Sequence, residues 1–191
     1  MMNGYLFDLD GTLIQSMHVW EDAVMRLFDR LNLKMDIDEA RDAFSAMKFT
    51  EVLEALIQHF QLPMSVKELY GMVIDDVREQ YTYTVQAVEG AVDYVKKCAA
   101  AGKRMCVVTA NDVPLTEAVL RRLGILQDMA FILSSKESGL TKRTPQMAEE
   151  AMRRLQLKPQ ECVMLEDSLY SMKSAKAAGC YVIAIASPEA K

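Results

Sequence analysis

The chain has 191 residues, 51% hydrophobic and 26% charged, which is typical of a soluble globular protein with one core and room for an inserted sub-domain. Its net charge of −5 argues against a nucleic-acid partner, although one local Lys and a metal ion can still attract a small anionic substrate. No apolar run is long enough to span a membrane, and the N-terminus lacks the features of a signal peptide, so we expect a cytoplasmic protein without a membrane partner.

The first 85 residues predict one strand followed by a helical block. Tyr5-Leu6-Phe7 predicts the strand, within residues 1–14. Apolar residues at helical spacing predict helices over 16–33, 49–60 and 65–83. Ser65 and Glu68 form a capping-box signature at the start of the third helix.

The rest of the chain alternates between predicted helices and strands. The helices are expected at 90–101, 114–123, 145–156 and 168–178, and the strands at 104–109, 130–133, 161–166 and 180–185. Continuous apolar runs in these strands favour a parallel sheet covered on both faces, in a doubly wound α/β fold. We therefore expect a catalytic core of residues 1–14 and 86–191, and an inserted α-helical cap of residues 15–85 that excludes water from a site at the carboxyl ends of the strands.

The four cysteines are predicted to be buried, reduced thiols. Cys98, Cys106, Cys162 and Cys180 include no C-x-x-C pair, and neither histidine lies near them in the sequence. A zinc site would need tighter clustering with His, so reduced thiols in a cytoplasmic protein are the favoured interpretation.

Polar residues follow the predicted strands. Asp8 and Asp10 end the first strand, where side chains two residues apart leave the same face, and Gly11 permits a sharp turn. Because the carboxyl ends of parallel strands share one edge of the sheet, polar residues from distant segments should converge there. These residues are Thr109, Lys142 upstream of Pro145, and Glu166 with Asp167.

This set of residue types suits phosphoryl transfer. The reaction concentrates negative charge on phosphoryl oxygens and needs cations and hydrogen-bond donors around them. Crowded carboxylates would repel each other without a hard cation, and ligation by oxygen alone suits Mg²⁺. Each motif also has an ordinary explanation: Asp-x-Asp-Gly as a turn, Thr109 as a strand residue, Lys142 as a solvated charge, and Ser168 as the cap of the next helix.

The ordered motifs resemble those of the haloacid dehalogenase superfamily of phosphatases and phosphomutases. They read Asp8-x-Asp10-Gly11-Thr12, Thr109, Lys142 with Pro145, and Glu166-Asp167-Ser168 followed by Ala175-x-x-Ala178-Gly179. The resemblance covers essentially the whole chain. Within the superfamily, the chain resembles the helical-cap subfamily of β-phosphoglucomutase-like and phosphoglycolate phosphatase-like proteins. The second Asp argues against dehalogenase chemistry, because a halide leaving group needs no proton.

The resemblance implies a role for each motif. Asp8 is implied as the nucleophile that forms an aspartyl-phosphate, and Asp10 as the general acid and then the general base. Thr109 donates a hydrogen bond to a phosphoryl oxygen, and Lys142 neutralises charge there. The implied Mg²⁺ group consists of Asp8, Asp10 through its backbone carbonyl, Asp167, and Glu166, which acts through a metal-bound water or steadies Lys142.

Six further residues are candidate substrate contacts. In the cap, Trp20 has helix packing as its alternative, His18 can face either the pocket or solvent, and Lys48 lies where related caps contact substrate. The complete candidate set is Thr12, Ala110, Asn111, Lys48, Trp20 and His18.

The chain departs from the family pattern without losing a catalytic group. Gln15 replaces a frequent Asp, Lys142-Arg143-Thr144-Pro145 replaces Lys-Pro-x-Pro, and Ser171 replaces a frequent Gly.

From the motifs and the resemblance together, we expect a Mg²⁺-dependent phosphatase acting on a small phosphorylated metabolite. A phosphosugar mutase of β-phosphoglucomutase type and a non-catalytic binding protein on the same fold are the alternatives, and the sequence predicts no oligomeric state.

Overall fold

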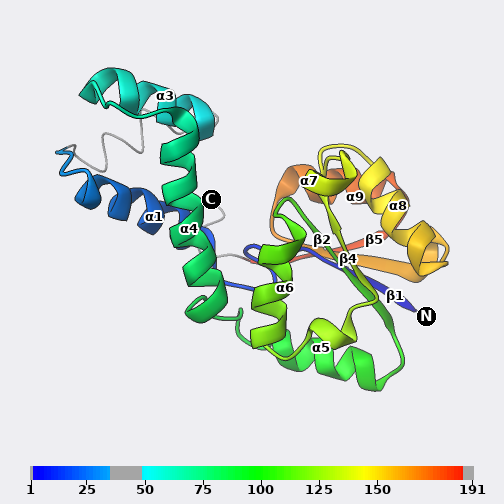
Figure 1. Ribbon diagram of the computed structural model, residues 1–191. Helices are drawn as coiled ribbons and strands as arrows, with labels where there is room; N and C mark the ends of the chain where they lie inside the picture. Colours follow the sequence, from blue (N-terminus) through cyan, green and yellow to red (C-terminus); the bar gives the residue numbers. More distant parts are fainter. Residues whose placement is uncertain (1, 35–48, 187–191) are drawn as a thin grey trace. The chain divides into compact units, whose positions relative to one another are not determined.

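The computed structural model describes residues 2–34 and 49–186, which divide into two compact units (Figure 1). The first unit contains Met1–Met17 and Tyr81–Lys191, and the second contains His18–Gln80. The boundaries between the two units therefore lie after residues 17 and 80, whereas the sequence predicts them after residues 14 and 85. Ser16 and Tyr81 both donate hydrogen bonds to Asp10, which ties these two segments to the first unit.

The first unit is built on a five-stranded parallel sheet with the order β3-β2-β1-β4-β5, so the predicted doubly wound α/β core is confirmed. The register pairs Phe7 with Val107 on one side and with Leu165 on the other, so the residues that follow these strands meet at one edge. The strands are β1 (Gly4–Phe7), β2 (Arg104–Thr109), β3 (Phe131–Ser134), β4 (Cys162–Glu166) and β5 (Tyr181–Ala184).

Helices cover both faces of this sheet (Figure 1). On one face lie α5 (Ala91–Ala100) and α6 (Val113–Arg122), and on the other α8 (Gln146–Leu155) and α9 (Leu169–Ala177). The sequence missed three short elements, because a helix of three or four residues is too short to show a hydrophobic period. These are α7 (Ser135–Ser138) and the 3₁₀ helices η1 (Leu126–Asp128) and η2 (Pro159–Glu161).

The main core fills the space between the sheet and the helices α8 and α9. Leu6 of β1 packs there with Cys106 of β2 and Met164 of β4, against Met147 and Ala151 of α8. Burial of these apolar side chains is the main favourable term that fixes the strand ends relative to one another. The four cysteines are buried free thiols, as predicted from their spacing.

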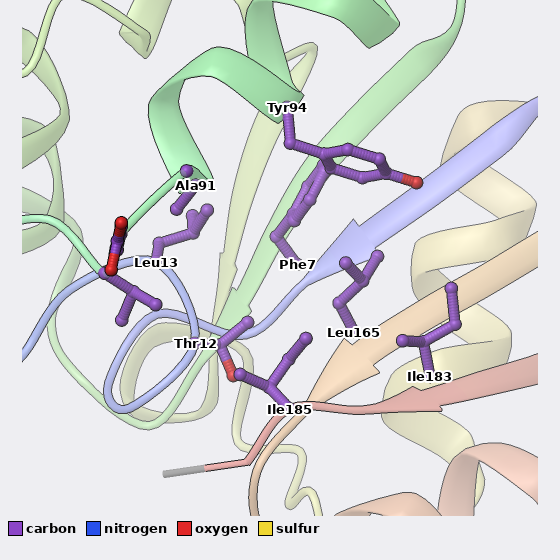
Figure 2. A pocket seen from close by; sticks show the side chains of 11 residues that line it. Phe7, Thr12, Leu13, Ala91, Tyr94, Leu165, Ile183 and Ile185 are labelled. Carbon is purple, nitrogen blue, oxygen red and sulfur yellow. The ribbon is translucent and has the colours of Figure 1, made fainter. Parts of the chain in front are cut away.

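The opposite face of β1, β4 and β5 carries an apolar hollow of about 370 Å³ (Figure 2). Phe7, Leu165 and Ile183 come from these three strands, and Tyr94 of α5 faces them. The Phe7 and Tyr94 rings meet edge to face, with centroids 6.3 Å apart. Ile183 remains 44% exposed, so the packing on this side of β5 is partial.

The second unit is helical, with α1 (Met17–Arg30), α3 (Phe49–Phe60) and the greater part of α4 (Val66–Tyr83). The Asp76 carboxylate is buried and pairs with Arg30 at 2.6 Å. The predicted capping box is confirmed: the Ser65 N–H donates to Glu68 at 2.8 Å, and the Glu68 N–H donates to the Ser65 hydroxyl at 3.3 Å. In the part of the chain that the structure describes, no helix has the length and apolar character needed to cross a membrane.

Candidate active site

The loop after β1 places two aspartates at the carboxyl edge of the sheet. The Asp8 N–H donates to the Leu165 carbonyl at 3.0 Å, which extends the pairing of β1 with β4 by one residue. The chain then turns tightly, with the N–H groups of Leu13 and Ile14 both donating to the Leu9 carbonyl. Asp8 is therefore fixed by the sheet, and Asp10 by the turn.

Gly11 is required in this turn for two reasons. Its φ of +80° lies in the left-handed region that favours glycine, and a Cβ there would lie 2.2 Å from Asp167 Oδ2. The absence of a side chain therefore allows the Asp167 carboxylate to approach the loop that carries Asp8 and Asp10.

Lys142 lies between two buried carboxylates. Its ammonium forms ion pairs with Asp8 Oδ1 and, at 2.7 Å, with Glu166 Oε2. The side chains of all three residues are 7% exposed or less. A charged lysine buried to this extent needs such partners, because removal of a single charge from water is costly.

These charges shift one another's proton affinities. Burial raises the pKa of Asp8 to about 7, although Lys142 acts to lower it. Burial acts to lower the pKa of Lys142, but Asp8 and Glu166 outweigh it, so this pKa lies above its ordinary value. Burial acts to raise the pKa of Glu166, but Lys142 keeps it below its ordinary value. Burial and then Glu166 raise the pKa of Asp167 to about 6.

Three carboxylates are arranged to accept a cation. Oxygen atoms of Asp8, Glu166 and Asp167 lie within 4.8 Å of one another. Three acidic groups beside the single ammonium of Lys142 leave an excess of negative charge, and a donor set made only of oxygen fits a hard divalent cation.

Glu166 already has partners at both of its oxygens, an ion pair at Oε2 and hydrogen bonds at Oε1. Oε2 pairs with Lys142, and Oε1 accepts hydrogen bonds from the Ser168 N–H at 3.0 Å and the Ser168 hydroxyl at 2.8 Å. The expected side-chain cap by Ser168 is wrong: this residue occupies the N-cap position of α9, but its hydroxyl donates to Glu166 and makes no cap bond. Asp8 and Asp167 are thus the acids better placed to ligate a cation.

Asp10 accepts hydrogen bonds from three separate segments. The Ser16 hydroxyl donates to its Oδ1 at 2.5 Å, and the Tyr81 hydroxyl donates to the same oxygen. Asn111 Nδ2 donates to its Oδ2 at 2.6 Å. Burial raises the pKa of Asp10, while the bonds from Ser16 and Tyr81 act to lower it. These three donors hold the carboxyl group in one orientation.

Three candidate residues follow one another at the end of β2. Thr109 is fully buried, and its Oγ1 accepts from the Asn111 N–H at 3.1 Å. Ala110 is exposed, and the Asn111 carbonyl accepts from the Ser134 hydroxyl at 2.6 Å. Asn111 thus has an observed role in holding Asp10, and substrate contacts by these three residues stay a prediction.

Thr12 lies on the wall of the apolar hollow, near Ile185 (Figure 2). Its Oγ1 is buried and has no hydrogen-bond partner among the described residues. The structure provides no contact that links Thr12 to the Asp8 and Lys142 cluster, so its substrate role stays a prediction.

The three candidates from the helical block are placed to different extents. Trp20 packs edge to face on Phe49, with ring centroids 5.9 Å apart, which agrees with the helix-packing alternative. His18 is exposed, and Lys48 lies outside the described residues. Substrate contact by these residues stays a prediction.

Sequence reasoning missed Ser16 and Tyr81 as site residues. Ser16 is the residue before α1, and Tyr81 belongs to the last turn of α4, so both read as ordinary helix residues. A buried tyrosine in a helix is most often core, and no spacing rule brings position 81 to position 10. Only the structure identifies these two residues as part of the site.

The comparisons with known proteins agree with these motifs. A family model described as haloacid dehalogenase-like hydrolase matches residues 2–179. The chain belongs to this family. Haloacid dehalogenase-like relatives of known name include hexitol phosphatase A of Escherichia coli (strain K12), 27% identical over 189 residues that cover 97% of this chain and 83% of that protein.

Two further proteins are similar to this haloacid dehalogenase-like hydrolase. Validoxylamine A 7'-phosphate phosphatase of Streptomyces hygroscopicus subsp. limoneus is 27% identical over 180 residues, covering 94% of this chain and 84% of that protein. The crystal structure of CbbY from Rhodobacter sphaeroides in complex with phosphate has a TM-score of 0.77 and 24% identity, covering 96% of this chain and 86% of that one. The latter likeness shows a shared fold.

Proposed function

We propose that this haloacid dehalogenase-like hydrolase is a Mg²⁺-dependent phosphatase that acts on a small phosphomonoester through an aspartyl-phosphate. The observation that carries the proposal is the buried Asp8 carboxylate, paired with the Lys142 ammonium and adjacent to Glu166 and Asp167. A carboxylate beside a fixed cation and further acidic ligands suits attack on a phosphoryl group, whose negative charge would otherwise repel the nucleophile.

The residues present fit Mg²⁺. Asp8 and Asp167 would hold it, with the backbone carbonyl of Asp10 as a further ligand, and Glu166 would steady Lys142. When bound, the ion supplies positive charge next to the phosphoryl oxygens and brings the phosphate to the nucleophile.

The proposed reaction has two steps. The Asp8 carboxylate attacks phosphorus, the bond between phosphorus and the leaving oxygen breaks, and Asp10 transfers its proton to that oxygen. The ionised Asp10 then takes a proton from a water molecule that attacks the aspartyl-phosphate, which releases inorganic phosphate and restores Asp8. In both steps Lys142 and Thr109 face the charge on the phosphoryl oxygens.

The names of the relatives support a polyol or sugar phosphate as the substrate. One acts on hexitol phosphates by its name, and another on validoxylamine A 7'-phosphate. We also propose that residues 15–85 act as a cap that recognises the organic part of the substrate, with His18, Trp20 and Lys48 as candidate contacts.

The test is phosphate release from a panel of sugar, polyol and small-acid phosphates, with Mg²⁺ and with EDTA. We expect Mg²⁺-dependent release from a few members, and loss of turnover in Asp8→Asn. Asp93→Asn, an exposed aspartate of α5, is the matched control and should retain activity.

Three results would overturn the proposal. Full activity of Asp8→Asn would exclude the aspartyl-phosphate. No release from any member, combined with conversion of glucose 1-phosphate in the presence of a bisphosphate activator, would favour the mutase. Mg²⁺ binding without either activity would indicate a binding protein.

A further inference from the structure

We propose that Tyr81 is a positioning residue that holds Asp10 in the orientation needed to protonate the leaving group. The inference rests on the proposed function, since it concerns the acid that serves the same reaction. It assigns a role to a residue outside the four sequence motifs, which neither composition nor spacing singled out.

Tyr81 is the largest fully buried side chain among the described residues, with 0% exposure. Its hydroxyl donates to Asp10 Oδ1, and it also accepts a hydrogen bond from Asn111 Nδ2 at 3.2 Å. Because the same Nδ2 donates to Asp10 Oδ2 at 2.6 Å, the three side chains form a closed triangle of hydrogen bonds.

This triangle fixes both oxygens of Asp10. A carboxyl group on a short side chain can rotate about its last bond, but a donor on each oxygen removes that freedom. The donors come from residues 81 and 111, far from Asp10 in the sequence, and Ser16 adds a third donor on Oδ1. The orientation of the acid is therefore determined by tertiary structure.

A tyrosine suits this task because its ring is rigid and its hydroxyl remains a neutral donor. Burial, followed by the charge of Asp10, raises the pKa of Tyr81 above its ordinary value of 10. Phenylalanine would retain the buried ring and remove only the hydroxyl, so Tyr81→Phe isolates the hydrogen bond from the packing.

The experiment compares two leaving groups. An alkyl phosphate needs a proton on its leaving oxygen, whereas 4-nitrophenyl phosphate releases a phenolate that needs none. The probes are 4-nitrophenyl phosphate and either sorbitol 6-phosphate or fructose 1-phosphate, whichever the wild type hydrolyses faster. The quantity is kcat/KM, which covers the steps up to formation of the aspartyl-phosphate.

Tyr81→Phe should lower kcat/KM for the alkyl phosphate by about 10- to 100-fold, the range expected when a catalytic group loses its positioning. The value for 4-nitrophenyl phosphate should fall less than about threefold. Tyr83→Phe is the matched control, because Tyr83 lies on the same helix and is 72% exposed, and it should change neither value.

The possible failures are distinguishable. Equal losses for the two substrates, or no loss for either, would overturn the role of Tyr81 while leaving the phosphatase in place. Full alkyl phosphatase activity of Asp10→Asn would instead overturn the proposed mechanism, and this inference with it. If Tyr81→Phe does not fold, Ser16→Ala removes another donor from the same oxygen and must show the same selective loss.

Discussion

Replacement of Lys142 by methionine tests the electrostatic argument most directly. Methionine has nearly the same length as lysine but no charge, so the substitution leaves Asp8 and Glu166 buried without their cation. Removal of one partner from a buried ion pair costs about 3–5 kcal/mol. In a chain of this length that loss lowers the melting temperature by roughly 6–20 °C.

The loss should depend on pH in a defined direction. Without Lys142, the folded-state pKa of Asp8 rises further above that of the unfolded chain, and the pKa of Glu166 rises from its lowered value, so the folded variant holds more protons than the wild type. The stability of the variant therefore falls as pH rises above about 4, the ordinary pKa of Asp8, and continues to fall beyond 7, where Lys142 holds this pKa in the wild type. The deficit relative to the wild type should be largest at pH 7.5 and smaller at pH 5.5.

The assay is urea unfolding at both pH values in the presence of EDTA, because Mg²⁺ would stand in for the missing charge. Lys136→Met is the matched control: this side chain is 59% exposed and pairs with Asp112 at 3.3 Å, so its loss should cost less than about 1 kcal/mol. Equal losses in the two variants, or a Lys142→Met deficit that does not change with pH, would refute the reasoning.

Three other predictions follow from the same site and core. Gly11→Ala should weaken Mg²⁺ binding in calorimetry and lower stability by about 1–3 kcal/mol, since its Cβ would collide with Asp167. Gly71→Ala is the control, because a Cβ at Gly71 would have nothing within 4 Å, and it should be neutral or stabilising. An equal loss of stability in Gly71→Ala would contradict the argument. The Mg²⁺ dissociation constant should increase as pH falls from 7.5 to 5.5, because protons compete for Asp8 and Asp167, whose pKa values are raised to about 7 and 6; a constant value would contradict it. The four buried cysteines should react with Ellman's reagent only after unfolding, and rapid reaction in native buffer would show that they are accessible.

The sequence predicted the sheet and the catalytic motifs because both depend on local pattern. Continuous apolar runs indicated the parallel strands, and Asp8, Lys142 and Asp167 were placed together because strand ends share an edge of the sheet. The family resemblance, which the comparisons support, rests on the same motifs.

Tyr81 and Ser16 could not be predicted in this way. The contacts that they make with Asp10 depend on how the ends of two helices return to the first unit, and no local rule determines that path. The hydroxyl of Tyr81 also has no period or spacing that separates it from the hydroxyls of other helix tyrosines. Only its complete burial beside a carboxylate distinguishes it from the exposed Tyr83 two residues later.

Ser171 shows how a departure from a family pattern can be compatible with the site. The frequent residue at this position is glycine, yet Ser171 is buried and the hydrogen bond from its side chain helps to keep the pKa of Glu166 low. The donor on Ser171 lowers the pKa of Glu166, as Lys142 and Ser168 do, so Glu166 stays ionised with partners at its oxygens. An ionised Glu166 in turn holds Lys142 against Asp8, which couples the fourth motif to the nucleophile through a single ammonium group.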